Sequence, residues 1–219
     1  MKRTIIITAD GSTTIQLTDW QEQYHSKHGA IQEATHVFIH MGLSLFSNKP
    51  SVSILEIGFG TGLNALLTLL ESEKQGLQVH YEGVEAYPVS QKELQQVNFP
   101  ELLDVPPSLF DTLHRANWEE DVMITPLFQL KKRKQFFDTI DDKDCFDLIY
   151  FDAFGARVQP ELWTELIFEK MFYALKSRGV LVTYAAKGSV RRAMQAVGFT
   201  VERLPGPPGK REMLRATKP

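Results

Sequence analysis

The chain has 219 residues, of which 43% are hydrophobic and 23% charged, a composition typical of one globular domain with a sizeable core. No apolar run approaches the ~20 residues of a membrane helix, and the single cysteine, Cys145, excludes an internal disulfide, so we expect a cytoplasmic protein that does not bind a membrane. The formal net charge of −3 does not indicate a nucleic-acid-binding protein, although residues 187–219 hold eight basic side chains and two acidic ones.

Residues 1–50 are predicted to form an N-terminal extension. A hairpin is expected over residues 3–9 and 13–17, joined by an Asp10-Gly11 turn, and a helix over 32–46. Because this extension precedes the core in the chain, we expect it to cover the active site.

Residues 51–219 alternate between short apolar runs and helical patterns, which predicts a single domain of the α/β class. The expected strands are 52–57, 79–84, 122–130, 146–151 and 180–185, followed by a hairpin of 199–204 and 212–217. The expected helices are 63–70, several between 88 and 118 that prolines interrupt, 160–176 and 189–197. We therefore predict a doubly wound, Rossmann-like sheet with one antiparallel strand in a C-terminal hairpin.

The turn after the first core strand carries glycines at 58, 60 and 62, in the motif Glu56-Ile57-Gly58-Phe59-Gly60-Thr61-Gly62-Leu63-Asn64. Glycines let the backbone approach a ligand, and the next helix directs free N–H groups toward it. The spacing differs from the Gly-x-Gly-x-x-Gly of dinucleotide-binding proteins, and Glu56 suits a cation better than a pyrophosphate. The pattern indicates S-adenosyl-L-methionine (SAM), a doubly cationic methyl donor, and hence a methyltransferase. Glycines that serve packing alone are the alternative.

Two further acidic residues come directly after core strands. Glu85 follows the second strand, where a carboxylate can accept both hydroxyls of a ribose, and Asp152 follows the strand 146–151. Because ligands of open α/β sheets bind at the carboxyl ends of the strands, Glu56, Glu85 and Asp152 are expected to converge. Phe154 is predicted either to line the methyl-transfer pocket or to be a core aromatic.

Histidine and lysine clusters give weaker indications. His36 and His40 lie one helical turn apart near His25 and His28, but no Glu completes a His-Glu-x-x-His motif, so we predict no metal. The basic run 131–134 is predicted to be either a phosphate-binding face or a solvated surface balanced by the acidic residues that follow.

Several segments, in this order along the chain, resemble the methyltransferase half of the MnmC family. They are Tyr24-His25-Ser26, Gly29-Ala30, Glu33, His36-Val37-Phe38, Leu55 to Asn64, Tyr150 to Phe154, Gln159 to Trp163, Thr183 to Gly188 and Gly209 to Met213. The resemblance covers nearly the whole chain. It implies SAM-dependent N-methylation of 5-aminomethyl-2-thiouridine at the tRNA wobble position. It also implies a standalone enzyme, with the flavin-dependent oxidoreductase of bifunctional members supplied by a separate chain.

The motifs and the resemblance together imply roles for individual residues. Asp152, Phe154 and Tyr24 are the expected catalytic residues, with Asp152 orienting the substrate amine or accepting its proton. The expected cofactor-binding residues are Glu56, Gly58, Phe59, Gly60, Thr61, Gly62, Asn64, Glu85 and Asp152. The expected substrate-binding residues are Tyr184 in the pocket and, on phosphates of the tRNA anticodon stem-loop, Lys187, Arg191, Arg192, Lys210 and Arg211.

The sequence departs from the family pattern at two places. Gly155-Ala156-Arg157 stands where the family often has a proline, and residues 130–133 lack an acidic residue to contact adenine, so we assign no adenine ligand. Because a fold does not determine a substrate, an aminopropyltransferase or a small-molecule amine methyltransferase is the alternative enzyme. A non-catalytic RNA-binding protein is the alternative from another class.

Overall fold

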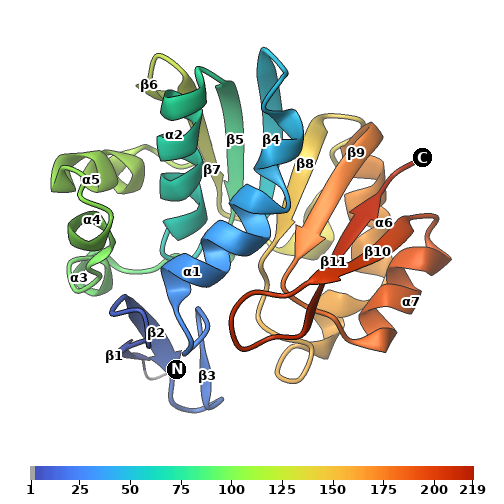
Figure 1. The fold of residues 1–219 in the computed structure, drawn as a ribbon, viewed down its shortest axis with the longest axis horizontal. Helices are drawn as coiled ribbons and strands as arrows, with labels where there is room; N and C mark the ends of the chain where they lie inside the picture. Colours follow the sequence, from blue (N-terminus) through green and yellow to red (C-terminus); the bar gives the residue numbers. More distant parts are fainter. Residues whose placement is uncertain (1–2) are drawn as a thin grey trace.

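The computed structural model describes residues 3–219, and within them eight strands form one central sheet (Figure 1). The strands of this sheet are, in spatial order, β10 (Thr200–Pro205), β11 (Glu212–Thr217), β9 (Leu175–Thr183), β8 (Phe146–Phe151), β4 (Ser51–Ile57), β5 (Gln78–Val84), β7 (Phe128–Arg133) and β6 (Asp121–Thr125). The five strands from β9 to β7 are parallel, which confirms the predicted Rossmann-like sheet. The predicted C-terminal hairpin is β10 and β11.

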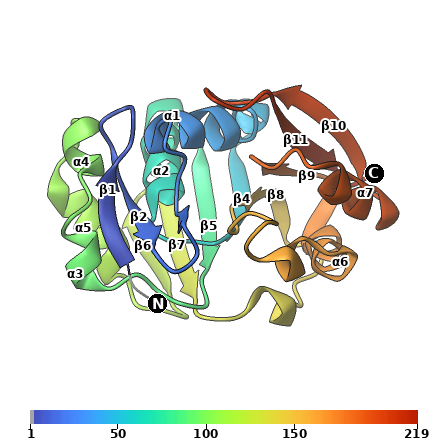
Figure 2. The same ribbon diagram turned by 90° about the horizontal axis from the view of Figure 1, so that it is seen from below.

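Helices cover both faces of the sheet. α1 (Ala30–Ala34) and α2 (Leu63–Gln75) lie on one face, and α6 (Glu165–Ala174) and α7 (Gly188–Ala196) lie on the other (Figure 2). Consecutive strand residues therefore enter different hydrophobic cores: Ile54 packs in the first and Leu55 in the second. No helix within residues 3–219 is long and apolar enough to cross a bilayer.

The predicted strand over 122–130 is wrong, because this segment forms two antiparallel strands. β6 ends at Thr125, β7 begins at Phe128, and Pro126 lies in the turn between them. Proline has no N–H to donate, so it interrupts a ladder of strand hydrogen bonds. β6 and β11 are both antiparallel to their parallel neighbours, whereas the sequence predicted one such strand.

Two predicted helices are divided into shorter pieces, whereas α2 extends five residues beyond its predicted end at residue 70. The expected helix over 32–46 consists of α1, a π-helix (Thr35–His40) and a 3₁₀-helix (Leu43–Phe46). The proline-rich region gives three short helices, α3 (Gln91–Leu94), α4 (Phe99–Leu102) and α5 (Pro107–Arg115). The expected helix over 160–176 is a 3₁₀-helix (Pro160–Trp163) followed by α6, and β9 begins directly afterwards. A further 3₁₀-helix is Phe137–Thr139.

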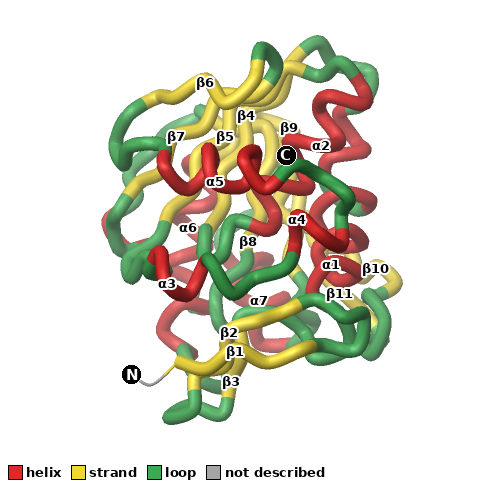
Figure 3. Tube along the Cα trace, turned by 90° about the vertical axis from the view of Figure 1, so that its left-hand side faces the viewer, coloured by secondary structure: helices red, strands yellow, loops and turns green. Residues whose placement is uncertain are grey.

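The N-terminal extension forms a small antiparallel sheet at one end of the molecule (Figure 3). β1 (Arg3–Ile7) pairs with β2 (Thr13–Leu17), as predicted, and the short β3 (Glu22–Gln23) adds a third strand. Asn98 joins this sheet to the core, since its Oδ1 accepts from the Thr13 N–H at 2.8 Å and its own N–H donates to Thr13 Oγ1 at 3.0 Å.

Candidate active site

A cavity of about 1340 Å³ lies at the carboxyl ends of β4, β5 and β8, and residues of the N-terminal sheet form part of its wall. The predicted site residues that line it are Tyr24, Glu56, Gly58, Phe59, Gly60, Thr61, Asn64, Glu85, Asp152, Phe154, Tyr184 and Lys210. The three strand-end carboxylates therefore converge as the sequence predicted. The predicted residues outside the lining are Gly62, Lys187, Arg191, Arg192 and Arg211.

The glycine turn keeps the cavity open beside Asp152. Gly58 and Gly60 have φ angles of 93° and 49°, a backbone region that side chains rarely adopt. A Cβ on Gly58 would lie 2.8 Å from the Asp152 carbonyl oxygen, and one on Gly60 would lie 3.2 Å from the Tyr24 ring. A Cβ on Gly62 would instead meet the His114 ring at 3.0 Å. Packing therefore accounts for Gly62, whereas Gly58 and Gly60 border the cavity.

The Asn64 side chain joins the two carboxylates nearest this turn. Its Nδ2 donates to Glu56 Oε1 at 2.8 Å and to Asp152 Oδ2 at 2.9 Å. Burial raises the pKa of the Glu56 carboxyl, and the hydrogen bond from Asn64 opposes that rise. Burial also raises the pKa of Asp152 to about 8, and its hydrogen bond from Asn64 again acts in the opposite direction. Two acids of altered pKa thus share one amide group.

Two buried acceptor atoms at this position fit a cationic ligand. Asn64 Oδ1 is buried and has no hydrogen-bond partner among residues 3–219, and the only donor beside the buried Glu56 Oε2 in these residues is the Tyr81 hydroxyl. A buried acceptor left without a donor is unfavourable, and an ammonium group would supply donors to both. The ammonium group of SAM therefore fits the residues present. No group of His, Cys, Asp or Glu within the described chain has an arrangement that could hold a metal ion.

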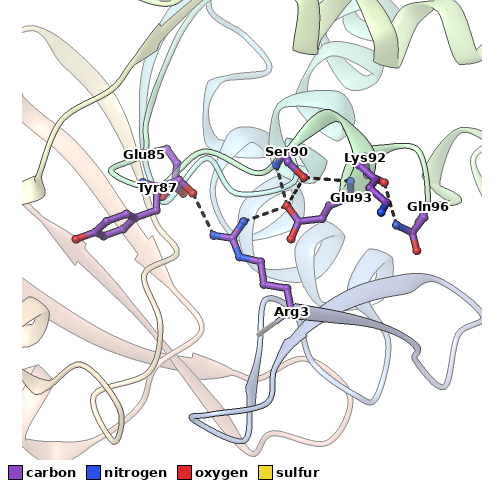
Figure 4. Close-up of polar contacts among 7 residues, drawn as sticks. All are labelled: Arg3, Glu85, Tyr87, Ser90, Lys92, Glu93 and Gln96. Carbon is purple, nitrogen blue, oxygen red and sulfur yellow. Dashed lines mark hydrogen bonds and ion pairs between the residues drawn. The ribbon is translucent and has the colours of Figure 1, made fainter. Parts of the chain in front are cut away.

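Backbone N–H groups and the N-terminal sheet fix the loop that carries Glu85. Its Oε2 accepts from the Gly60 N–H at 3.1 Å and its Oε1 from the Tyr87 N–H at 2.9 Å. Figure 4 shows Arg3 reaching this loop from β1. Arg3 Nη2 donates to the Tyr87 carbonyl at 3.3 Å, and Arg3 Nη1 donates to Glu93 Oε2 at 3.2 Å. Glu85 is thus presented at the cavity in a set orientation.

Aromatic side chains form the wall beside Asp152. The Phe154 ring lies edge-on to Tyr24 at 5.0 Å and to Trp20 at 6.0 Å between centroids. Tyr184 Oη donates to the Ala153 carbonyl at 2.8 Å, next to Asp152 in the chain. Phe154 is only half-buried and lines the cavity, so it belongs to the pocket and not to the core.

The basic residues expected to bind phosphate fall into two groups. Lys187, Arg192 and Arg211 are exposed, with Lys187 at the start of α7. Lys210 points into the cavity instead, where Nζ lies 2.5 Å from Glu33 Oε2 and 3.9 Å from the Tyr184 ring centroid. Phosphate binding by these residues stays a prediction, and Lys210 lies in the cavity lining, apart from Lys187, Arg192 and Arg211.

Neither prediction for the basic run 131–134 describes its two central residues. Lys132 is only 1% exposed and donates to the His114 carbonyl at 2.7 Å. Arg133 pairs with Glu82 at 3.1 Å and with Asp142 at 2.8 Å. Both residues belong to β7, which extends beyond the predicted strand end.

Several lining residues escaped the sequence analysis. Phe136, Phe137 and Asp138 follow β7 and line the cavity near Tyr87, and Arg157 lines it from the loop after β8. Because the strand was predicted to end at Leu130, only the basic residues 131–134 were expected at its carboxyl end. The true end at Arg133 brings the acidic Asp138 to the carboxyl edge of the sheet. Residues 131–133 are Lys-Lys-Arg and continue no apolar alternation, so no local pattern marked the longer strand.

The chain is similar to known methyltransferases and MnmC proteins. Residues 114–219 match a family described as S-adenosyl-L-methionine-dependent methyltransferase. The chain is 32% identical over 210 residues to the tRNA 5-methylaminomethyl-2-thiouridine biosynthesis bifunctional protein MnmC of Magnetococcus marinus, a match that covers 88% of this chain and 30% of that protein. The chain thus spans about a third of the length of the curated relatives that it matches.

Solved structures share the fold. The structure of MNMC2 from Aquifex aeolicus superposes with a TM-score of 0.81 at 24% identity and covers 100% of this chain and 71% of that one. Spermidine synthase from Thermotoga maritima superposes with a TM-score of 0.58 at 14% identity, over 98% of this chain and 72% of that one. The second match shows that the fold alone does not distinguish methyl transfer from other group transfers.

Proposed function

We propose that this chain is a SAM-dependent methyltransferase related to the MnmC proteins, and that it methylates the primary amine of 5-aminomethyl-2-thiouridine in tRNA. The name of the Magnetococcus marinus relative refers to 5-methylaminomethyl-2-thiouridine, which is the product of this transfer. The observation that carries the proposal is the position of Asp152, whose carboxyl lines the cavity beside Glu56 and accepts from Asn64 Nδ2 at 2.9 Å, where it can meet an amine that approaches the cofactor.

The cofactor residues follow from the free acceptors of the site. SAM, when bound, supplies an electrophilic methyl group. Glu56 and Asn64 would hold its ammonium group, and Glu85 would accept hydrogen bonds from its ribose hydroxyls. The glycine turn would let the backbone approach the cofactor. Asp138 is a candidate acceptor for the exocyclic amine of adenine, because it lines the cavity after β7.

The amine must lose a proton to react. If it behaves like lysine, with a pKa of ~10.4, reaching the neutral form at pH 7 costs roughly 5 kcal/mol. An ordinary carboxyl is a poor acceptor for that proton, because its pKa lies ~6 units below that of the amine. Asp152, with a pKa of about 8, lies only ~2 units below it. At pH 7 a carboxyl with this pKa is ionised in roughly one molecule in ten, and in that form Asp152 can orient the amine through a hydrogen bond and accept its proton.

The charge of the cavity also favours a cationic substrate. The acidic residues among its lining are Glu22, Glu33, Glu56, Glu85, Asp138, Asp152 and Glu161, and its lysines and arginines are Arg3, Lys27, Arg157 and Lys210. Glu56 and Asp152 add to this excess only when they are ionised, and the other five acids still outnumber the four basic side chains, which disfavours a free phosphate in the cavity. We propose that the tRNA backbone is bound outside the cavity, by Lys187, Arg191, Arg192 and Arg211 near α7.

The test is transfer of a labelled methyl group from SAM to tRNA that carries 5-aminomethyl-2-thiouridine, followed by nucleoside analysis. We expect label in 5-methylaminomethyl-2-thiouridine, and loss of at least ~10²-fold in kcat for Asp152→Ala. Asp147→Asn is the matched control, since this carboxylate lies on β8 and pairs with Lys176 at 2.8 Å outside the cavity lining.

Two results would contradict the proposal. Normal turnover by Asp152→Ala would remove Asp152 from the chemistry. Methylation of free amines without methylation of tRNA would assign the site to a small-molecule enzyme. Incubation with decarboxylated SAM tests the aminopropyl transfer that the shared fold also permits.

A further inference from the structure

Lys210 and Glu33 form an ion pair inside the cavity wall. Lys210 Nζ lies 2.5 Å from Glu33 Oε2, and their side chains are 31% and 12% exposed. The same ammonium group lies 3.9 Å from the centroid of the Tyr184 ring, within the range of a cation–π contact. A lysine held by both a carboxylate and a ring has little freedom to turn toward an external phosphate. This pair is therefore a fixed feature of the pocket.

The pair joins the two ends of the chain at the site. Glu33 belongs to α1 of the N-terminal extension, whereas Lys210 lies in the loop between β10 and β11. The same loop is also held where His36 Nε2 forms a hydrogen bond with the Pro205 carbonyl at 2.8 Å. Tyr184, which lies under the Lys210 ammonium, is bonded to the carbonyl of Ala153 beside Asp152. Glu33, Lys210 and Asp152 thus line the same cavity, and Tyr184 lies between the Lys210 ammonium and the segment that carries Asp152.

We propose that Glu33 and Lys210 are positioning residues, a fixed pair of opposite charges that sets the protonation of Asp152 and of the incoming amine. This inference rests on the proposed function. Neither residue is required to touch the methyl group or the amine. Each acts on the reacting groups through the electrostatic potential of the pocket, which the protein around these side chains screens less than bulk water does.

The two charges act on Asp152 in opposite directions. Burial is the main reason that the pKa of Asp152 is raised; the Glu33 carboxylate adds to the rise, and the Lys210 ammonium and the Asn64 amide oppose it. The titratable side chains that interact with Asp152 from the surrounding elements are Glu33, Glu56, Tyr81, Tyr184 and Lys210. Lys210 is the cation of this set. Its ammonium group also disfavours a second cation nearby, so it favours the neutral amine.

The test is the dependence of kcat/KM on pH in two single variants and their combination. In Lys210→Met, the midpoint of the rise in activity should move up by about one pH unit, because Asp152 and the amine lose a nearby cation. In Glu33→Gln it should move down by a similar amount. The double variant should return close to the wild-type midpoint. Glu202→Gln and Arg215→Met, which remove a pair 3.0 Å apart on the outer hairpin, are the matched controls and should not move it.

If the ion pair only holds the loop between β10 and β11 in place, a different result is expected. It would lower activity in both single variants, leave the midpoint unchanged, and give no recovery in the double variant; that outcome overturns the inference. Titration of the Asp152 carboxyl by ¹³C NMR, assigned with Asp152→Asn, gives the same readout without substrate or cofactor. If wild-type protein does not methylate tRNA, the proposed function fails. Opposite displacements of the Asp152 titration in the two variants would still support the charge pair, and unmoved titrations would refute it.

Discussion

Replacing Asp152 with asparagine is expected to make the protein more stable as it removes activity. Asparagine has the same shape, and its Oδ1 can still accept the hydrogen bond that Asn64 Nδ2 donates at 2.9 Å. The substitution therefore removes one ionisable group and little packing. Because the pKa of Asp152 in the folded protein is raised from 3.8 to about 8, the folded state binds a proton more tightly than the unfolded state.

The sign and size of the effect follow from that difference. Between pH 3.8 and 8 the folded chain retains a proton that the unfolded chain releases, so the wild-type free energy of unfolding falls as pH rises. At about 1.4 kcal/mol per pH unit, the penalty at pH 7 is at most about 4 kcal/mol. Water that enters the open cavity reduces it, so we expect about 2 kcal/mol. The asparagine variant does not bear this penalty.

Urea denaturation of both proteins at pH 4, 5.5, 7 and 8 measures the difference. At pH 4 the side chain is largely neutral in both folded proteins, so that measurement is the internal reference. We expect the variant's advantage in free energy of unfolding to grow steadily from pH 4 to pH 8. A difference that stays constant over this range would refute the raised pKa, and with it the argument that Asp152 is matched to an amine.

Three further predictions concern other buried groups. Lys132→Met should be more stable than wild type near pH 7 and lose that advantage toward pH 10. Burial lowers the pKa of Lys132 to about 8, so the unfolded chain binds the proton more tightly than the folded protein does. Urea denaturation at the two pH values measures the difference in free energy of unfolding. Arg3→Met should weaken SAM binding several-fold in calorimetry, because Arg3 holds the loop that carries Glu85. Arg115→Met, which changes an exposed side chain on α5, is the control. His25→Gln should reduce the loss of thermal stability between pH 6.5 and 4.5, because burial lowers the pKa of His25 to about 4 and wild-type protein is destabilised as its unfolded state takes up protons. If the loss of thermal stability between pH 6.5 and 4.5 is the same in both proteins, groups other than His25 cause it.

Local sequence patterns predicted the parts of the site that depend on one strand and its following turn. The buried run ending at Ile57, the glycines after it, and the acids after β5 and β8 are each set within a few residues. The parallel sheet then brings the strand ends together by its topology. Glu56, Glu85 and Asp152 could be assigned to one site for that reason.

The remaining site depends on contacts between distant segments, which local patterns do not encode. Lys210 lies in a basic C-terminal segment, which indicated phosphate binding. Its contacts with Glu33 and Tyr184 come only from the fold. Asp138 was missed because the strand before it was ended three residues early, at Leu130, and a turn at Pro126 was overlooked. Arg3 lies 84 residues from Tyr87, whose carbonyl it binds, so no window of sequence contains both.

The way Asn64 holds its two partners explains why so many acids can coexist at this edge. One amide nitrogen donates to Glu56 and to Asp152, and both carboxylates are raised in pKa by burial. Two like charges so placed are unfavourable when both are ionised, and protonation is one way to relieve them. A bound cation is another way, since Asn64 Oδ1 has no donor among residues 3–219 and the Glu56 carboxylate can accept from a cation as well as from the Tyr81 hydroxyl. Binding of a cationic cofactor should therefore release a proton from this pair. The burial of these carboxyls, which lowers the stability of the folded protein, then favours binding of the cofactor, and the ionised Asp152 can accept a proton from the amine.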